Sequence, residues 1–541
     1  MIRLIFKALL LMTFTVAAGL SSVSRAQQST TSLTGEWVGN SEPSGRSEFL
    51  RLSLTENAGE MRRPLKAKLT LVQLEGSRVR LELSSLKLVM TGTLAGDEIE
   101  GEAEVPGIKA RFHLVRTVKV APEILARYVG VYRFRNGDHL MIDSFPDTPD
   151  TLFVTDVKSG EARAVFPRSE TQFTGGPALR VVSPTRQTLT FRDDGVHVID
   201  LDQKGRQSGT FATRVPIRRE EVTFKNGDVT LAGTLLLPAS KKKHPALVFT
   251  HGGGPQLREV YWGLGYLYAA RGFAVLSYDK RGVGKSTGNW REASFEDLAD
   301  DAVAAAKFLQ ARTDIAANQI GFLGQSQGGW IAPLAASRFP DAAFAVAMSG
   351  GGLSPAETEL FDTEYELTKA GYTANEINDA LAFQKLKNEI IASPDSNDKW
   401  EQYAKLRLNA KDQKWFRHPG IDVFGAEKRA DGFWTYMRKF YFYDPAPTLR
   451  ASPAPLLAIF GELDTPEGVK ANVSAIRQIM DQAGRRDYIV KVYPNGSHNL
   501  MEVPPDNPNE SVRLKRFPPG LFETMVDWTT TQLRRRGQVR R

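Results

Sequence analysis

The pattern of apolar and polar positions changes character near Arg218. Before it, residues 30–215 carry short runs of alternating or β-branched apolar residues, broken by glycine, aspartate and asparagine. Such alternation is typical of strands with one buried face, and such turn residues separate antiparallel strands. Two stretches, 30–120 and 121–216, each open on a glycine-aromatic strand and close on another strand. The pattern predicts two small antiparallel β units.

A different rhythm occupies residues 218–536. Continuous apolar runs such as "PALVFTHGGG" and "PLLAIFGELD" alternate with helical segments, one of which begins with a Ser294–Asp297 capping box. Strands without alternation are buried on both faces, so we expect a mostly parallel sheet with helices on both faces. Residues 353–450 interrupt this rhythm with aromatic-rich helical sequence. They predict a helical lid inserted between two core strands.

Composition and charge narrow the class of protein. The 541 residues exceed one typical core, and 41% hydrophobic with 24% charged residues is ordinary for a globular protein. The net charge of +8 comes from three basic residues in segment 1–26 and five arginines in segment 534–541. The remainder is neutral, which gives no basic groove and predicts no nucleic-acid partner.

Residues 1–26 have the features of a secretory signal peptide. A basic start precedes an apolar run from Ala8 to Leu20, and Ser24-Arg25-Ala26 offers a cleavage site. The run is shorter than the ~20 residues that span a bilayer. We therefore expect an exported protein, periplasmic or extracellular, with no stable membrane span after processing. The chain has no cysteine, which excludes disulfides and a thiol nucleophile.

A Gly-x-Ser-x-Gly sequence lies where a predicted strand meets a predicted helix. In "QIGFLGQSQGGWIAPLAA" the serine is Ser326, flanked by Gly324 and Gly328. A nucleophilic serine must project from a sharp strand-to-helix turn, and glycines let strand and helix approach closely around it. The free N–H groups of the helix N-terminus then favour an oxyanion beside the serine.

A serine nucleophile needs a base, and the seven histidines can be compared individually. His498, in "YPNGSHNL", directly follows the last predicted core strand, at the edge where open α/β sheets place their sites. It is the predicted base. The alternatives are three histidines of the β region, one expected to be exposed after a lysine run, one in the insertion and one in a glycine-rich loop: His113, His139, His197, His244, His418 and His251.

The acid that orients the histidine should lie between serine and histidine, after a strand. Asp464, in "LLAIFGELDTPEG", fits this position, and Glu462 is the fallback. Asp444 is less favoured because Pro445 indicates a turn. The oxyanion donors are expected to be the backbone N–H of Gln327, and of Gly253 in "FTHGGGPQ". His251 in that loop is expected to shape the loop and not to act as the base.

These motifs, in the order "HGGGP", "SYDKRGVGKSTG", "GQSQGGW", "GELD" and "GSHN", resemble those of the α/β-hydrolase family over about residues 218–536. They are most similar to secreted or periplasmic esterases and serine-aminopeptidase-like hydrolases. The resemblance implies the fold, the triad and acyl-transfer chemistry. "RGVGKSTG" is not a phosphate-binding loop, since that pattern needs glycine where this chain has Asp279.

The leading hypothesis is a serine esterase that cleaves small-molecule acyl esters through an acyl-enzyme, with no metal and no cofactor. An aminopeptidase or dipeptidyl-peptidase is the alternative. It needs an acidic pair in the lid to hold an amine. A binding protein with a degenerate hydrolase is disfavoured because every triad and oxyanion position is occupied, although the β region could still bind a cell-envelope ligand. The candidate amine-binding acids are Glu357, Asp362, Glu364 and Glu366.

Overall fold

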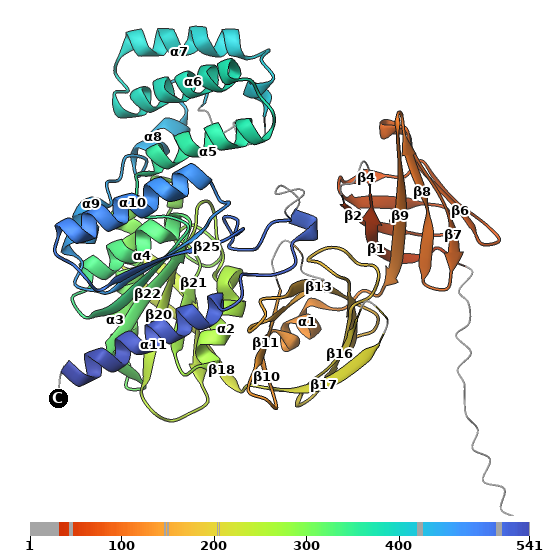
Figure 1. Ribbon diagram of the computed structural model, residues 1–541, viewed down its shortest axis with the longest axis horizontal. Coiled ribbons are helices and arrows are strands. Elements are labelled where there is room, and N and C mark those ends of the chain that lie inside the picture. The colour runs from red at the N-terminus through yellow and green to blue at the C-terminus, as the bar shows by residue number, and fades with distance from the viewer. Residues whose placement is uncertain are drawn as a thin grey trace, which may run out of the picture.

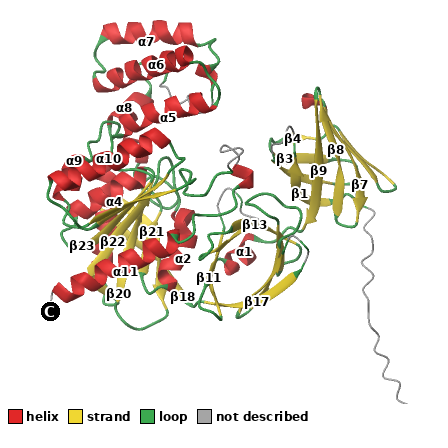
Figure 2. Cartoon of the chain, viewed as in Figure 1, coloured by secondary structure: helices red, strands yellow, loops and turns green. Residues whose placement is uncertain are grey.

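The computed structural model describes residues 32–42, 47–144, 148, 151–202, 204, 206–418, 426–504 and 511–539. The predicted signal peptide at 1–26 lies outside these residues. The described chain forms three sheets in sequence order, with helices gathered in the C-terminal half (Figures 1 and 2). Among the described residues, no helix is both long and apolar enough to cross a membrane.

The first sheet has nine antiparallel strands in the order β4-β3-β2-β1-β9-β8-β7-β6-β5. Its core is built by alternation: in β6, Val79, Leu81 and Leu83 are buried while the residues between them are more exposed. Trp37 of β1 is fully buried in the same core. The strands are β1 (Gly35–Ser41), β2 (Glu48–Leu54), β3 (Gly59–Arg63), β4 (Ala67–Lys68), β5 (Leu71–Glu75), β6 (Arg78–Leu83), β7 (Leu88–Ala95), β8 (Glu98–Val105) and β9 (Ile108–Thr117).

The second sheet is a closed antiparallel barrel. Pairing of β10 with β17, for example Arg133 with Thr213, joins its two ends. Helix α1 (Pro122–Tyr128) precedes the barrel and lies within its outline in Figure 1. The ring of Tyr128, at the end of this helix, stacks on the barrel residue Phe191 with centroids 3.8 Å apart. The prediction of an N-terminal antiparallel β region is thus confirmed. The barrel strands are β10 (Gly130–Phe134), β11 (His139–Asp143), β12 (Leu152–Asp156), β13 (Ala162–Pro167), β14 (Gln172–Gly175), β15 (Gln187–Arg192), β16 (Gly195–Leu201) and β17 (Gln207–Arg214).

The third sheet has the order β18-β19-β21-β20-β22-β23-β24-β25. The six strands from β21 to β25 in this order are parallel, and the β18–β19 hairpin adds two antiparallel strands at one edge. Every residue of β21 and β23 is buried, as the continuous apolar runs predict. The strands are β18 (Ile217–Asn226), β19 (Val229–Pro238), β20 (His244–Thr250), β21 (Ala274–Tyr278), β22 (Ile315–Gln325), β23 (Ala342–Met348), β24 (Leu456–Gly461) and β25 (Tyr488–Tyr493).

Helices cover both faces of this sheet, so the predicted α/β architecture is confirmed. Helices α3 (Phe295–Gln310), α4 (Gln327–Arg338), α9 (Ala446–Ala451) and α10 (Pro466–Gln482) share one apolar core with one face. Helices α2 (Trp262–Ala270) and α11 (Leu521–Val539) pack on the other face, in a core that continues into the barrel. The predicted capping box begins α3: Ser294 Oγ accepts the Asp297 N–H, and the Asp297 carboxylate accepts the Ser294 N–H.

Four helices follow β23 and precede α9 and β24: α5 (Pro355–Lys369), α6 (Ala374–Ala392), α7 (Asn397–Ala410) and α8 (Gly432–Arg438). They have a core of their own, which includes Phe383, Trp434 and Tyr441. In Figure 1, α5 and α8 lie nearer the sheet than α6 and α7 do. Short 3₁₀ turns occur at Ser84–Leu86, Arg258–Tyr261, Trp290–Glu292, Trp415–Arg417 and Ser511–Arg513.

One carboxylate joins the barrel to the third sheet's helices. Asp143, at the end of β11, accepts the N–H of Gly263 in α2 at 2.8 Å. Burial raises the pKa of Asp143 to about 7, although the Gly263 and Ser144 N–H groups oppose this rise. The junction is therefore sensitive to the ionisation of Asp143.

The expectation that His244 is exposed is wrong. His244 opens β20 and is 5% exposed, with Nε2 3.2 Å from the carbonyl oxygen of Ser240. The lysine run before it ends where the buried strand begins, so the histidine belongs to the strand and not to the polar loop.

Candidate active site

Ser326 stands at the join of β22 and α4 in a strained backbone conformation. Its φ of 57° and ψ of −124° lie in a region that L-residues seldom adopt, at a cost of roughly 1–3 kcal/mol. Two backbone hydrogen bonds hold it there: Ser326 N–H donates to Met348 O at 2.9 Å, and Gly329 N–H donates to Ser326 O at 2.7 Å. A strained turn of this kind exposes the side chain of its central residue above the sheet.

The close approach of strand and helix around Ser326 requires glycine. A Cβ on Gly324 would lie 2.0 Å from Thr250 Oγ1 and 2.3 Å from Gly328 O. A Cβ on Gly328 would lie 2.6 Å from Thr250 O. These contacts are with neighbouring structure that cannot move aside, so both glycines of the pentapeptide are sterically necessary.

His498 and Asp464 meet at the carboxyl edge of the parallel strands. His498 Nδ1 lies 2.9 Å from Asp464 Oδ2, which joins the loop after β25 to the loop after β24. Desolvation alone would lower the pKa of His498, but the hydrogen bond and charge of Asp464, helped by Asp362, leave that pKa above 6.5. The side-chain amide of Gln325 and the hydroxyl of Ser349 each donate to His498 O at 2.9 Å. The imidazole is thus oriented through both its ring and its backbone.

The two other candidate acids have different partners. Glu462 Oε2 accepts the N–H of Asn495 at 3.2 Å. Asp444 Oδ1 accepts the N–H of Ala446, the first residue of α9, at 2.9 Å. Of the three acids considered from sequence, the structure places Asp464 against the imidazole.

A cavity of about 260 Å³ contains all five sequence-predicted site residues in its lining: Ser326, Gln327, Gly253, Asp464 and His498. Its apolar wall is aromatic and comes from both the core and the inserted helices: Phe295, Trp330, Tyr436, Phe440 and Phe460. A cavity of this size admits a small acyl group, and its polar groups converge at one end of the parallel sheet.

Of the four acids considered for amine recognition, one lines the cavity. Asp362 does so, and it accepts a hydrogen bond from the Thr465 hydroxyl. Burial raises the pKa of Asp362 to about 6. The other three do not line the cavity: Glu357 caps α5, Glu364 is exposed, and Glu366 pairs with Lys369.

Glu359, which the sequence did not single out, also lines the cavity. Its Oε2 accepts a hydrogen bond from Lys387 Nζ at 3.1 Å and another from the Tyr441 hydroxyl. Lys387 is fully buried, so Glu359 is neutralised by a cation of the inserted helices. Of the two α5 acids that line the cavity, Glu359 is thus already paired with a cation.

The glycine-rich loop after β20 is held in place by contacts of His251 and Gln256. His251 is 7% exposed, and its Nε2 contacts the carbonyl oxygen of Tyr278. Burial lowers the pKa of His251 to about 3, so the ring is neutral and serves as a packing group. The N–H of Gly252 donates to Gln256 Oε1 at 2.8 Å, whereas Gly253 lines the cavity.

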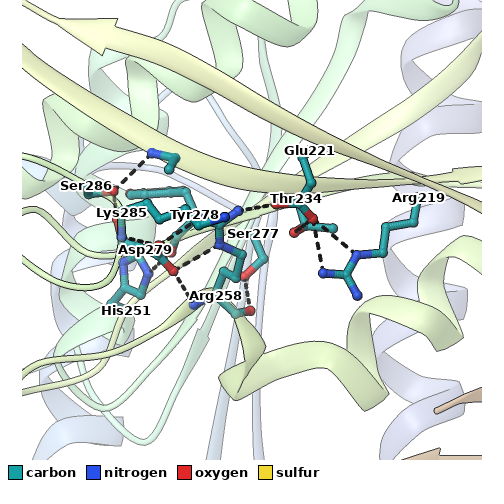
Figure 3. Close-up of polar contacts among 11 residues, drawn as sticks. Arg219, Glu221, Thr234, His251, Arg258, Ser277, Tyr278, Asp279, Lys285 and Ser286 are labelled. Carbon is teal, nitrogen blue, oxygen red and sulfur yellow. Dashed lines mark hydrogen bonds and ion pairs between the residues drawn. The ribbon is translucent and has the colours of Figure 1, made fainter. Parts of the chain in front are cut away.

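The "DKRGVGKS" loop is organised by the carboxylate of Asp279, which is 2% exposed (Figure 3). Asp279 accepts two side-chain hydrogen bonds from Arg258, at 3.0 and 2.7 Å, and the N–H of Lys285 at 2.9 Å. Burial would raise the pKa of Asp279, but these donors outweigh it and hold the pKa below its ordinary value. The backbone N–H of Lys285 thus donates to a carboxylate of its own loop. The loop is a structural support beside the site.

Sequence reasoning missed two groups at this site, Lys280 and Glu359. Lys280 lies next to the quoted "RGVGKSTG" and is 1% exposed. In the sequence Lys280 stands between Asp279 and Arg281 directly after a core strand, so it is not distinguishable from an exposed loop lysine. One further group of metal-ligand type occurs among the described residues, away from the cavity lining: Glu98, Glu100 and His113, whose ligand atoms lie within 4.8 Å of one another on β8 and β9.

Comparison with known proteins agrees with this architecture. The profile of the alpha/beta hydrolase family matches residues 247–513, which include all the site residues described above. The part of the chain that holds the site, about half of its length, therefore matches the α/β-hydrolase family. The esterase EstD of Thermotoga maritima is 23% identical over 337 residues, covering 58% of this chain and 71% of that protein.

Two solved structures also resemble the chain. The alpha/beta hydrolase GrgF from Penicillium sp. sh18 is 19% identical, with 59% of this chain and 98% of that chain covered and a TM-score of 0.37. Acetyl xylan esterase 1 from Thermoanaerobacterium sp. is 16% identical, with 57% and 81% covered and a TM-score of 0.29.

Proposed function

We propose that this protein is a serine hydrolase that cleaves carboxylic esters through an acyl-enzyme. The observation that carries the proposal is the 2.9 Å contact of His498 with Asp464 on the same cavity as a strained Ser326. The similarity to the esterase EstD supports an ester substrate.

In the proposed reaction, Ser326 Oγ attacks the acyl carbon and His498 takes the hydroxyl proton. The negative charge on the acyl oxygen is held by the N–H groups of Gln327 and Gly253. The intermediate then expels the alkoxide, which takes the proton from His498. A water molecule, deprotonated by the same imidazole, hydrolyses the acyl-enzyme. Asp464 keeps the Nδ1 proton in place and stabilises the imidazolium.

The inserted helices act in this proposal as a lid. Tyr436 and Phe440, from the segment around α8, and Asp362 of α5 contribute to the cavity wall. With about 260 Å³ available, short acyl chains are expected to be preferred. The exopeptidase alternative is less favoured, because Glu359, which with Asp362 could form the acidic pair for an amine, is already paired with Lys387.

The test is labelling with a fluorophosphonate, followed by turnover of short-chain nitrophenyl esters and of aminoacyl amides. The Ser326→Ala variant should lose both labelling and ester turnover. The matched control is Ser337→Ala on the same helix, where the hydroxyl donates only to Leu334 O within the helix. Full ester turnover by Ser326→Ala would refute the proposal, and faster cleavage of amides than of esters would favour the exopeptidase.

A further inference from the structure

A lysine ammonium is buried directly behind the proposed oxyanion loop. Lys280 is 1% exposed, and its Nζ donates to Gly252 O at 2.9 Å, Gly254 O at 3.1 Å and Gln327 Oε1 at 2.6 Å. The three ammonium protons thus meet three uncharged oxygens. A buried ammonium is normally paired with a carboxylate, because burying an isolated charge is costly. Such an arrangement calls for a functional explanation.

The two charged residues next to Lys280 in the sequence form ion pairs with other residues. Asp279, the preceding residue, is bound by Arg258. Arg281, the following residue, forms an ion pair with Asp301 at 2.7 Å. The lysine therefore belongs to the loop and to Gln327, and not to the ion-pair scaffold around it.

We propose that Lys280 is the positioning residue of the oxyanion hole: its ammonium ties the Gly252–Gly254 loop to Gln327 and polarises the peptide that carries the Gly253 N–H. This inference rests on the ester-hydrolase function proposed above. The hydrogen bonds of the Lys280 ammonium go to Gly252, Gly254 and Gln327, so it acts through the oxyanion donors and not on the substrate.

The geometry of the peptide group explains the effect. Gly252 C=O and Gly253 N–H belong to the same planar unit and point in opposite directions when the peptide is trans. Because Lys280 binds the oxygen, the N–H is directed away from the lysine, and Gly253 lines the cavity. A cation on the oxygen draws electrons from the nitrogen and strengthens the N–H as a donor, as cooperative hydrogen bonding does.

The same ammonium fixes the second donor. The Gln327 N–H is at the first residue of α4, where helix N–H groups have no intrahelical acceptor. Anchoring the Gln327 side chain at 2.6 Å holds this residue against the glycine loop. The positive charge of the ammonium lies next to the groups that carry both N–H donors, so it also attracts the negative charge of an oxyanion. Donors that are already in place before the reaction lower the barrier most.

Ionisation of Lys280 should appear in the pH dependence. The groups that face it are the neutral His251 of the glycine loop and the Trp290 ring, whose centroid lies 5.7 Å from Lys280 Nζ and which also contacts Arg291; Tyr436 of α8 shares Gln327 with the lysine. Burial lowers the pKa of Lys280 to about 7. The ammonium is present below that pKa and lost above it, so kcat should decline on the alkaline side, while His498 must be neutral and limits the acid side.

The experiment compares Lys280→Met, which keeps the side-chain length and removes the charge, with Lys285→Met, an exposed lysine of the same loop. Both variants are assayed for kcat and KM on a nitrophenyl ester, and for affinity to a trifluoromethyl ketone. This inhibitor forms a tetrahedral adduct with the serine and so reports on the oxyanion hole. Lys280→Met should lower kcat about 10- to 100-fold, while KM changes less than threefold. Its affinity for the trifluoromethyl ketone should fall by a factor similar to that in kcat. Lys285→Met should match the wild type.

Several outcomes would overturn the proposal. An unchanged kcat, a rise in KM alone, or undiminished affinity for the ketone would each show that Lys280 does not serve the transition state. If Lys280→Met does not fold, Lys280→Gln replaces it. If neither folds, Gln327→Leu, which removes the side-chain acceptor of Lys280 and keeps the Gln327 N–H, is assayed in the same way, and an unchanged kcat overturns the proposal. Absence of fluorophosphonate labelling in the wild type would instead refute the hydrolase function itself.

Discussion

Replacing Asp464 by asparagine tests the central contact of the site with little change in shape. The carboxylate accepts the Nδ1 proton of His498 at 2.9 Å, which leaves Nε2 free to accept the serine proton. An asparagine can turn its NH₂ group toward Nδ1 of His498 and donate to it. Nδ1 would then be the acceptor, and the ring proton would be on Nε2. An imidazole in that tautomer cannot deprotonate Ser326.

The size of the effect follows from these two losses, of tautomer and of charge. In other triads the same substitution lowers kcat about 10⁴-fold, which is about 5 kcal/mol of transition-state stabilisation. The charge loss has its own signature. Desolvation lowers the pKa of His498 while Asp464 raises it, so removing Asp464 should move that pKa downward. The base must be neutral, so the acid limb of kcat/KM should shift to lower pH.

The assay is the pH profile of kcat/KM for a nitrophenyl ester in wild type, Asp464→Asn and Glu462→Gln. Glu462 lies two residues away and accepts the Asn495 N–H, so its variant controls for disturbance of the same loop. Glu462→Gln should stay within about threefold of wild type. A loss below tenfold in Asp464→Asn, or an equal loss in Glu462→Gln, would show that Asp464 does not orient the base.

Two further predictions concern the scaffold. Gly324→Ala should lower the melting temperature and abolish fluorophosphonate labelling, because its Cβ would fall 2.0 Å from Thr250 Oγ1 and overpacking costs about 1–3 kcal/mol or more. Gly432→Ala, whose Cβ would meet nothing within 4 Å, should change neither, and a stable, labelled Gly324→Ala would contradict the steric argument. For Asp143, a folded-state pKa of about 7 against 3.8 means that ionisation opposes folding. Stability should therefore fall as pH rises from about 4 to 7 and then level off, by about 3 kcal/mol between pH 5 and 8. Asp143→Asn should remove that decrease in thermal unfolding measured at both pH values, and an unchanged decrease would assign it to other groups.

Local sequence determined the elements around the site because each of them has a short-range cause. The runs that became β21 and β23 are apolar throughout since both faces of the sheet are covered by helices. The turn at Ser326 could be predicted because strand, glycines and helix are contiguous in the chain. Chain order then placed His498 after the last strand, at the edge where parallel strands end together.

Contacts between distant residues could not be predicted in the same way. Asp464, Glu462 and Asp444 were all plausible partners of His498, and only the folded loops decide which carboxylate reaches the ring. Closure of the barrel depends on β10 meeting β17, about eighty residues later, and alternation alone is the same in an open sheet.

The contacts of Lys280 could not be predicted from sequence for the same reason. The sequence by itself determined the parallel sheet, the strained serine turn and the order of serine, acid and histidine, because these arise from periodicity and from neighbours along the chain. The tertiary structure decided which carboxylate reaches His498 and which oxygens surround the ammonium of Lys280. Its acceptors lie 28, 26 and 47 residues away, and burial and hydrogen bonding over such separations exist only in the folded chain.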